Sequence, residues 1–490
     1  MLARLMAIIL FISIMVSESL VAQPPEIVWT RFYSGATYEF GQCLRPTTDG
    51  GFVISGYKWK FNMSDTDAYL IKTDADGDTV WTRTYGGFDD EGATSVRQTA
   101  DGGYIMAGYT RSFGAGGTDV YLIKTDAGGE LLWTGIFGGD SSDVASSVEQ
   151  ISDGGYIITG RTYIFGPGET DVYVIRTDSM GDSLWTRTFG GLAGEEDYGN
   201  AALQTFDGKF AVVAKKGAFG PDPSSIWLLK LDDNGDTLWT RTYGGTFYDI
   251  GASVQQSPDE SYFILGSTYS FITASYDIYL IRTANNGDTV WTRTYGGFGE
   301  HIGSSGCQTA DGGFVVAGYT SLTLQSDQNA YIIRTDVAGD SLWAMNFGGE
   351  ELDMARSVTE AADGGYAVTG YTYSFGQGDA DIFLLKLASD QTGIDDRNIE
   401  NLPSGFALYQ NYPNPFNATT TIRYFLPKSS HVRCDIYDLL GGRIVSLQSG
   451  LMPAGDHSLN WDASKMPTGV YFARVVAGEY SGSITLLLLK

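Results

Sequence analysis

Short runs of β-branched and aromatic residues alternate with turns rich in glycine and aspartate from Trp29 to Leu387. One unit of this pattern contains the runs 92–99, 104–110 and 119–126 and a run around Trp133. The turn Asp101-Gly102-Gly103 separates the first two runs. Runs of this length, bounded by Gly and Asp, are typical of β-strands. The unit therefore predicts four strands in roughly 50 residues, the size of one propeller blade.

The last run of every unit carries a tryptophan, which makes the repeat easy to count. Tryptophan recurs at positions 29, 81, 133, 185, 239, 291 and 343, with spacings of 52 residues except for one of 54. Seven tryptophan runs and seven sets of the other three runs predict an all-β fold, a seven-bladed β-propeller over residues 23–388.

The tryptophan runs and the three-run sets are offset by one strand. The run around Trp29 precedes the first complete set, and the last set ends at Leu387 without a fourth strand. We expect the N-terminal strand, Ile27–Tyr33, to pair with Phe383–Lys386 in the last blade, because closure of the ring removes open sheet edges. An open array of sheets is the alternative, and it would leave both strands unpaired.

A different pattern begins after Leu387. Residues 389–403 are polar and predict a linker, whereas residues 404–490 contain new strand patterns. Examples are Thr420–Tyr424, Val432–Tyr437 and Gly469–Val475, with Trp461 as the expected core anchor. These alternating segments predict a small immunoglobulin-like β-sandwich.

The C-terminal region also contains an extended motif. It begins with Leu408-Tyr409-Gln410, continues as Asn411, Tyr412, Pro413, Asn414, Pro415, Phe416 and Asn417, and is followed by Trp461-Asp462 and Gly469-Val470-Tyr471-Phe472. These residues closely resemble the type A C-terminal sorting domain of bacterial type IX secretion substrates, although Ala418 stands where that family usually has proline. The resemblance implies the type IX secretion machinery as a partner. It also implies passage through the periplasm and a final location that is secreted or on the outer cell surface.

The Asp-Gly-Gly-Tyr repeats are similar to propeller repeats found in such exported proteins, and that resemblance implies no particular activity. At the N-terminus, Arg4 precedes the apolar run Leu5–Val16 and the small and polar residues 17–22. This order predicts a secretory signal peptide over residues 1–22. The run is shorter than the roughly 20 residues that a spanning helix needs, so we expect no stable transmembrane segment after cleavage.

The charge balance excludes several classes of function. The chain has 31 Lys and Arg against 58 Asp and Glu, a net charge of −27. Phosphate groups repel such a chain, so no nucleic-acid partner is expected. Only 3 His and 3 Cys are present, which leaves little material for an acid–base constellation, a histidine metal site or a disulfide framework. We expect no catalytic residues and no cofactor, with calcium as the one possible exception.

The composition instead favours a binding or structural module that engages an extracellular protein or glycan. The alternative is an extracellular glycan-active enzyme, a lyase or hydrolase, on a propeller scaffold. An active site should break the symmetry of the repeat, and no blade gains an insertion that carries an isolated His, an isolated Cys or a pair of carboxylates.

One group of acids does recur, nine to twelve residues after each tryptophan: Glu39, Glu91, Asp143, Asp197, Asp249, Glu300 and Asp353. The loop that carries them leads to the innermost strand, so they are expected to encircle one mouth of the channel, where like charges repel. Two interpretations stay open. Each carboxylate accepts hydrogen bonds from the adjacent Gly-Gly loop, or the mouth also binds a hard cation such as calcium.

Other motifs favour structural interpretations. Gly181-Asp182-Ser183-Leu184 and Gly339-Asp340-Ser341-Leu342 spell an esterase nucleophile motif. Equivalent positions in other repeats hold Thr79, Leu131 and Thr237, so the motif predicts a hairpin turn. The same reasoning makes Asp74–Asp78 a turn instead of a calcium loop. The glutamines at one position of the innermost strands are expected to satisfy backbone groups between blades or to line a wet channel: Gln98, Gln150, Gln204, Gln256 and Gln308.

Aromatic residues fall into two groups. The one at the end of each tryptophan strand, such as Tyr85, is expected to pack between blades. Aromatic residues of the longer loops are better candidates for binding a ligand, because such loops tolerate variation. These residues are Trp59, Phe61, Phe113, Phe165, Phe219, Phe271 and Phe375.

Overall fold

The chain divides into two compact units, which are described separately: Gln23–Gln391, and a second unit that contains Thr392–Lys490. The computed structural model describes residues 24–35, 37–60, 65–163, 169–191, 195–217, 224–271, 275–297, 299–321, 328–377, 379–390, 407–408, 418–426, 428–437, 442–452, 455–478 and 480–488. Within these ranges no helix is long and apolar enough to span a membrane. The predicted signal peptide lies outside the described residues.

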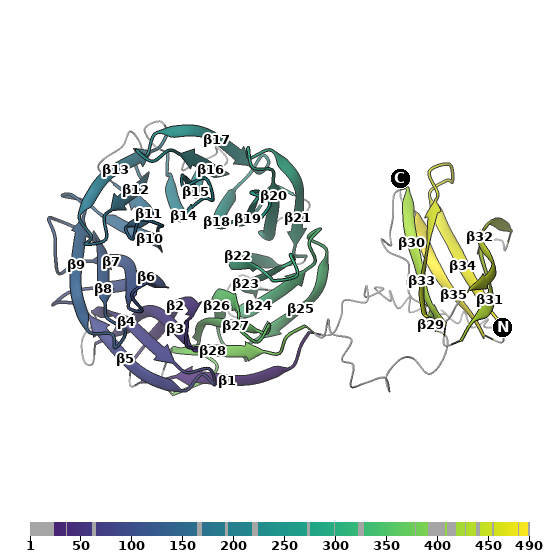
Figure 1. Ribbon diagram of the computed structural model, residues 1–490, viewed down its shortest axis with the longest axis horizontal. Coiled ribbons are helices and arrows are strands. Elements are labelled where there is room, and N and C mark those ends of the chain that lie inside the picture. Colours follow the sequence, from purple (N-terminus) through teal and green to yellow (C-terminus); the bar gives the residue numbers. More distant parts are fainter. Residues whose placement is uncertain are drawn as a thin grey trace, which may run out of the picture. The chain divides into compact units, whose positions relative to one another are not determined.

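The first unit is a ring of seven four-stranded antiparallel sheets (Figure 1). From the innermost strand outwards, blade 1 contains β2 (Glu39–Pro46), β3 (Phe52–Trp59), β4 (Thr66–Thr73) and β5 (Thr79–Tyr85). Blade 2 contains β6 (Glu91–Gln98), β7 (Tyr104–Thr110), β8 (Asp119–Thr125) and β9 (Leu131–Phe137). Blade 3 contains β10 (Asp143–Gln150), β11 (Tyr156–Thr162), β12 (Asp171–Thr177) and β13 (Ser183–Phe189).

The other four blades follow the same order. Blade 4 contains β14 (Tyr198–Gln204), β15 (Phe210–Lys216), β16 (Ser225–Leu231) and β17 (Thr237–Tyr243). Blade 5 contains β18 (Asp249–Gln256), β19 (Tyr262–Thr268), β20 (Asp277–Thr283) and β21 (Thr289–Tyr295). Blade 6 contains β22 (Glu300–Gln308), β23 (Phe314–Ser321), β24 (Gln328–Thr335) and β25 (Ser341–Phe347). Blade 7 contains β26 (Asp353–Glu360), β27 (Tyr366–Thr372), β28 (Asp381–Leu387) and β1 (Ile27–Tyr33).

The predicted closure of the ring is confirmed. β1 pairs antiparallel with β28, with Thr30 opposite Leu385 and Arg31 opposite Leu384. The first strand of the chain therefore completes the last blade, and the ring has no open array end (Figure 1). The propeller extends slightly further than predicted. Asp390, assigned to the linker from the sequence, accepts hydrogen bonds from Arg334 Nε at 2.7 Å and Trp343 Nε1 at 2.6 Å.

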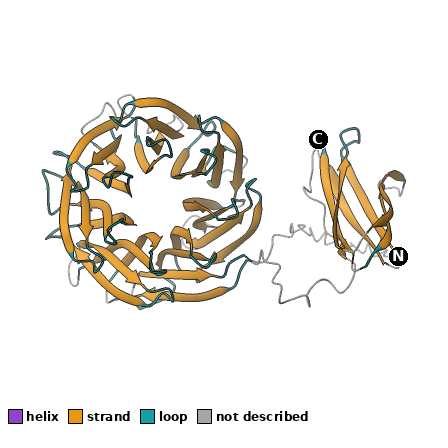
Figure 2. Ribbon diagram, viewed as in Figure 1, coloured by secondary structure: helices purple, strands orange, loops and turns teal. Residues whose placement is uncertain are grey.

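The blades of the ring consist of strands joined by loops (Figure 2), and burial follows the position of each strand within its blade. Every residue of β8 and of β19 is buried, whereas β5 alternates between exposed and half-buried residues before its buried last residue. Each blade packs between two neighbours, so both faces of its middle strands are covered. The outer strands keep the alternation of a half-buried strand, and the innermost strands alternate in part between buried and half-buried residues.

A turn that begins with aspartate joins the two innermost strands of each blade, as Asp-Gly-Gly in five blades, Asp207-Gly208-Lys209 in blade 4 and Asp259-Glu260-Ser261 in blade 5. In blade 2, Asp101 Oδ1 accepts the Gly103 N–H at 3.0 Å, and Asp101 Oδ2 lies 2.9 Å from Nζ of the buried Lys124. All seven blades contain this ion pair: Lys72–Asp49, Lys124–Asp101, Arg176–Asp153, Lys230–Asp207, Arg282–Asp259, Arg334–Asp311 and Lys386–Asp363. The repeated motif is therefore a turn whose aspartate neutralises a buried cation.

The tryptophan strand of each blade contacts a glycine turn of the next blade, as Trp81 and Tyr85 of blade 1 contact the Gly129 turn of blade 2. A Cβ added to Gly129, whose φ is +78°, would lie 2.8 Å from the Trp81 ring, so only glycine fits this turn. Tyr85 Oη donates to the Gly129 carbonyl at 2.6 Å, and Arg83 lies 5.6 Å from the Trp81 ring centroid. The prediction that Tyr85 packs between blades is confirmed. Gly181, with φ +86°, makes the same approach to Trp133, which confirms the turn interpretation of the esterase-like motif.

The glutamines of the innermost strands link neighbouring blades. Gln98 Oε1 accepts the Thr48 N–H of blade 1 at 2.9 Å, and its Nε2 donates to the Gly102 carbonyl at 3.3 Å. Gln150, Gln204 and Gln256 accept equivalent backbone N–H groups at 2.8 Å. The predicted role between blades is therefore confirmed. Gln308 differs because the equivalent residue of blade 5 is Pro258, which has no N–H to donate.

The second unit contains two sheets that share one core. One sheet has the order β29 (Ala407–Leu408), β30 (Thr419–Leu426), β33 (Gly455–Asp462). The other has the order β32 (Arg443–Met452), β31 (Ser430–Tyr437), β34 (Gly469–Ala477), β35 (Tyr480–Leu488). Trp461 is 3% exposed and packs edge-on against Tyr471, so the expected core anchor is confirmed. The arrangement is a β-sandwich.

Candidate functional site

The predicted acids lie where the loop from each tryptophan strand enters the next innermost strand. Six of them are at most 1% exposed: Glu39, Glu91, Asp143, Asp197, Asp249 and Asp353. None of these six belongs to the described lining of the central channel. The structure thus corrects the expected placement, because the carboxylates are buried between blades instead of facing an open mouth.

The sixth blade departs from the predicted set. His301 N–H donates to the Tyr276 carbonyl at 2.7 Å, as Asp249 N–H donates to the Ser224 carbonyl at 3.0 Å. His301 therefore occupies the repeated position, while Glu300 precedes it and is half-buried. Burial lowers the pKa of His301, and the nearby Asp277 opposes this shift only in part.

The buried acids hold the Gly-Gly loops. Glu91 Oε2 accepts the Gly87 N–H at 2.7 Å, and its Oε1 accepts the hydroxyl of Thr110 at 2.7 Å. Equivalent glycine N–H groups donate to the acids of five other blades at 2.7 to 3.3 Å: Gly35 to Glu39, Gly139 to Asp143, Gly191 to Asp197, Gly245 to Asp249 and Gly349 to Asp353. These contacts are the ones that the structural interpretation of the ring requires.

A second acid faces the first across most blade junctions. A Cβ on Gly138 would lie 2.0 Å from Asp119 Oδ1 and 2.7 Å from Asp143 Oδ2, so the two carboxyl groups converge on this glycine. Burial raises the pKa of both carboxyl groups, and the charge of Asp143 raises that of Asp119 further. The junctions therefore contain pairs of acids that resist ionising together.

Metal binding by the ring stays a prediction. Among the described residues, one group of three carboxylates places its ligand atoms within 4.8 Å of one another: Asp65, Asp89 and Asp90. This group lies in the loops of blade 1, and Asp90 already pairs with Arg111 at 3.2 Å. The buried ring supplies acids in pairs, fewer oxygen ligands than the six to eight that calcium takes.

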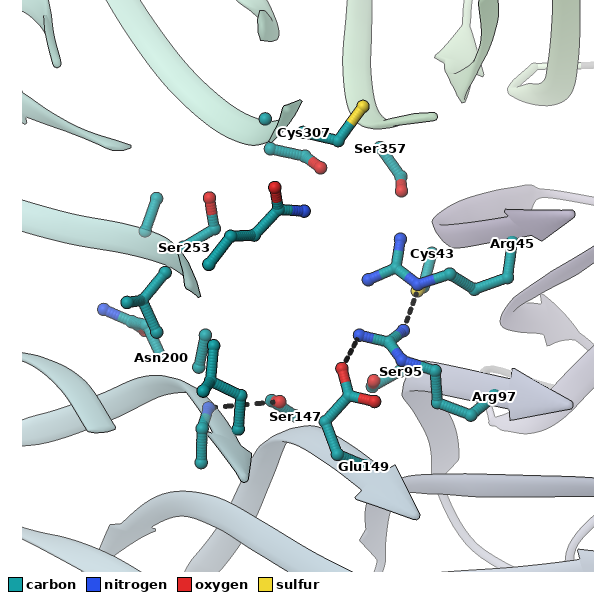
Figure 3. A pocket seen from close by; sticks show the side chains of 18 of the residues that line it. Cys43, Arg45, Ser95, Arg97, Ser147, Glu149, Asn200, Ser253, Cys307 and Ser357 are labelled. Carbon is teal, nitrogen blue, oxygen red and sulfur yellow. Dashed lines mark hydrogen bonds and ion pairs between the residues drawn. The ribbon is translucent and has the colours of Figure 1, made fainter. Parts of the chain in front are cut away.

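The central channel contains a cavity of about 730 Å³ lined by the innermost strands of all seven blades (Figure 3). Its charged lining residues are Arg45, Arg97, Arg356 and Glu149. At the position that Arg45 and Arg97 hold in blades 1 and 2, blade 3 has Glu149, and the other blades have neutral residues: Leu203, Gln255, Cys307 and Thr359. The channel therefore breaks the sevenfold repeat on one side.

Two of these charged residues form an ion pair. Arg97 pairs with Glu149, and its Nη1 donates to the Val96 carbonyl at 2.9 Å and lies 3.8 Å from Cys43 Sγ (Figure 3). Burial alone would raise the pKa of the Cys43 thiol, but Arg45 and Arg97 bring it below its usual value. Burial raises the pKa of Cys307, on the innermost strand of blade 6, to about 11.

An aromatic cluster lies at the loop end of blades 1 and 7. It consists of Tyr38, Phe40, Tyr57, Trp59, Tyr371 and Tyr373, with neighbouring ring centroids 4.7 to 6.5 Å apart. Arg356, which lines the channel, lies 5.4 Å from the Tyr371 ring centroid and connects the cluster with the channel. Burial raises the pKa of Tyr57 to about 12, so its hydroxyl stays protonated.

Sequence reasoning identified one member of this cluster, Trp59, as a binding candidate. Of the other described loop aromatics, Phe113 contacts Tyr121 and Phe271 contacts Tyr279. Phe113 and Phe375 remain 41% and 38% exposed, and ligand binding by these residues stays a prediction. The arginines of the channel were missed, although aligning the seven repeats would have shown charged residues at a position that is neutral elsewhere. Phe61, Phe165 and Phe219 lie outside the described residues, as does the motif Asn411–Asn417.

Comparison with known proteins identifies the second unit. Residues 410–488 match the family described as the secretion system C-terminal sorting domain. This segment is a sorting domain. The chain is a type IX secretion substrate, exported to the cell surface or the extracellular space.

One curated protein matches a smaller part of the chain. A segment of 154 residues is 30% identical to the regulatory protein FlaEY of Caulobacter vibrioides, and the chain spans 16% of that protein. This match covers 26% of the chain.

Two solved structures are similar at 12% identity. One is PorZ, a surface component of the type IX secretion system of Porphyromonas gingivalis, with a TM-score of 0.42 over 91% of this chain and 59% of that chain. The other is the β-propeller domain of the Trilobed protease from Pyrococcus furiosus, with a TM-score of 0.40 over 75% of this chain and 100% of that chain.

Proposed function

We propose that the chain is an exported, non-catalytic binding module whose ligand docks on the aromatic cluster of blades 1 and 7. The observation that carries this proposal is the cluster itself. Six aromatic rings are in contact at one blade junction, and Tyr373 remains 38% exposed. A soluble propeller gains little from half-exposed rings on its surface, whereas a docking partner buries them.

The chemistry of the cluster favours a glycan as the ligand. The faces of Trp59 and Tyr38 offer apolar surface to a sugar ring, and the protonated phenol of Tyr57 offers a hydrogen-bond donor. Hydrolysis of a glycoside commonly uses two carboxyl groups on either side of the bond. The described channel lining offers one carboxylate, Glu149, which is already paired with Arg97. Binding without turnover therefore fits these residues better than glycan cleavage.

The experiment is a screen of the mature chain against immobilised bacterial and plant polysaccharides, followed by calorimetry on each binder. Trp59→Ala and Tyr373→Ala should each weaken binding about tenfold, the effect of losing ~1.4 kcal/mol of contact energy. Phe271→Ala removes a loop aromatic of blade 5 and is the matched control, expected to leave affinity unchanged. Equal losses in all three variants, or release of shortened glycan products, would contradict the proposal.

A further inference from the structure

The charge of the channel is opposite to that of the protein. The chain carries a net charge of −27, yet the charged residues that line the channel are three arginines and one glutamate. Walls of low dielectric constant strengthen the field of charges inside such a channel. The interior of this acidic propeller is therefore a local region of positive potential.

Arg45 lines the channel without an ion pair of its own among the described residues, as Arg356 does. Arg45 Nη1 donates to the Leu44 carbonyl at 2.8 Å. The Arg45 guanidinium group is half-buried and points into the cavity beside that of Arg97 (Figure 3). Burying a cation next to a second cation is unfavourable unless an anion compensates the charge.

Arg97 is held in place on the same side of the cavity. Its ion pair with Glu149 and its hydrogen bond to the Val96 carbonyl orient the guanidinium group before any ligand arrives. Guanidinium groups form paired hydrogen bonds with the oxygens of carboxylates and phosphates. Two such groups side by side offer one such anion more donors than either arginine alone.

We propose that the channel contains an oxyanion site in which Arg45, supported by Arg97, binds a carboxylate or phosphate group of a ligand. The site uses none of the residues of the aromatic cluster, so it can fail or succeed independently of the proposed glycan binding. The side of the channel formed by blades 4, 5 and 6, with Leu203, Gln255 and Cys307, has no charged lining residue and leaves room for the rest of the ligand.

The first test measures the melting temperature and binding heat of the mature chain with inorganic phosphate, at an ionic strength held constant with chloride. Phosphate should raise the melting temperature by mass action. Arg45→Gln should weaken phosphate binding about tenfold or more, since hydrogen bonds between charged groups are the stronger class. Arg241→Gln removes a surface arginine of blade 4 that pairs with Asp288 and is the matched control.

The second test measures cysteine alkylation in the wild-type protein, with and without phosphate. Cys43 lies against Arg97, Cys307 lies on blade 6 of the same channel, and Cys434 belongs to the other unit; all three cysteines are free. Bound phosphate should slow alkylation of Cys43 by the neutral reagent iodoacetamide and leave Cys434 unaffected. Equal melting shifts in wild-type and Arg45→Gln protein, or unchanged alkylation of Cys43 at saturating phosphate, would overturn the proposal.

A third arm separates the two sources of the anion. Glucuronate supplies a carboxylate on a sugar, and glucose 6-phosphate supplies a phosphate on the same kind of ring. Tighter binding of either one, lost in Arg45→Gln, identifies the group that the site prefers. Arg45→Lys keeps the charge but loses the paired donors, so it should retain a weakened response. A full response in Arg45→Lys would contradict paired hydrogen bonding by Arg45.

Discussion

At one end of the propeller, here called the hairpin end, turns join the two innermost strands of each blade, and the aspartate of each turn pairs with a lysine or arginine. At the opposite end, the loop end, the loop from each tryptophan strand enters the next innermost strand, and six of these seven entry positions hold a buried acid. In junctions such as Asp119–Asp143, that acid faces a second acid. Asp101 is 59% exposed and pairs with Lys124, whereas Asp143 is fully buried and accepts the Gly139 N–H. The same residue type recurs in both rings of the repeat. Its environment decides whether its charge is favoured or opposed.

The comparison has its largest consequence in the pH dependence of stability. Burial alone would raise the pKa of Asp101, but hydrogen bonds from Thr99, Lys124 and the Gly103 N–H bring it to about 2. Asp49 and Asp207 behave alike. Their contribution to stability is complete above the ordinary carboxyl pKa of about 3.9 and is lost as the pH falls towards 2.

The loop acids act in the opposite direction. Burial raises the pKa of Asp119, Asp143 and Asp249, so the folded state holds these protons more tightly than the unfolded chain. Their contribution is present at low pH and is lost as the pH rises through the raised pKa values. Calorimetry between pH 2 and 8 should therefore show a maximum melting temperature at mildly acidic pH. The double variant Asp119→Asn, Asp143→Asn should flatten only the decline on the alkaline side; a change in the acid limb would contradict the assignment.

Glycine substitutions should also distinguish the two ends. Gly138→Ala places a methyl group 2.0 Å from Asp119 Oδ1 and should destabilise the fold by about 2–3 kcal/mol, the range for overpacking. Gly102→Ala, in the Asp-Gly-Gly turn, meets nothing within 4 Å and should cost only the ~1 kcal/mol of a left-handed backbone. Urea denaturation measures both free energies of unfolding. A larger loss for Gly102→Ala would reverse the comparison.

Removing one carboxylate charge at each end should have effects of opposite sign at pH 7. Asp101→Asn weakens the ion pair with Lys124 and should destabilise the fold by about 1 kcal/mol, the scale of solvent-exposed pairs. Asp143→Asn keeps an oxygen that accepts the Gly139 N–H and removes repulsion with Asp119, so it should be neutral or stabilising. Unfolding curves of the two variants, recorded in one buffer, test the difference. Destabilisation of both by equal amounts would show that the two environments are equivalent.

The smallest expected effect is that of calcium. If hydrogen bonds from the Gly-Gly loops satisfy the buried acids, calcium at millimolar concentration should raise the melting temperature no more than magnesium does. A calcium-specific rise that disappears in the double variant Glu91→Gln, Asp249→Asn would instead establish the cation site. Calorimetric heat of calcium binding provides the independent measurement.

Much of the architecture could be predicted because each contact is repeated at a constant spacing. The Trp81 strand, the Gly129 turn and the Gln98 amide use local patterns that recur in nearly every blade. A feature of this kind is read from the chain without knowing how the blades pack. The buried acid pairs could not be predicted from the sequence in the same way. Asp119 and Asp143 belong to different blades, and nothing in either pattern indicates that both converge on Gly138.

The candidate sites depend on deviations from the repeat. Arg45, Arg97 and Glu149 are single substitutions in three different blades, and only the ring brings their side chains into one cavity. The aromatic cluster joins residues near position 40 with Tyr371 and Tyr373 because blades 1 and 7 become neighbours on closure. Separation of more than 300 residues along the chain hides such contacts from any local pattern.

The sequence by itself determined the number of blades, the closing strand and the turn chemistry, because all three follow from a repeat that can be counted along the chain. It determined the sorting domain because that motif lies within one continuous segment. Only the tertiary structure decided which acids are buried, that Asp390 belongs to the propeller, and that arginines of blades 1, 2 and 7 line one positive channel. The physical reason is that burial and charge compensation depend on what neighbouring blades contribute. In a closed ring, every blade has two such neighbours, including the first and the last.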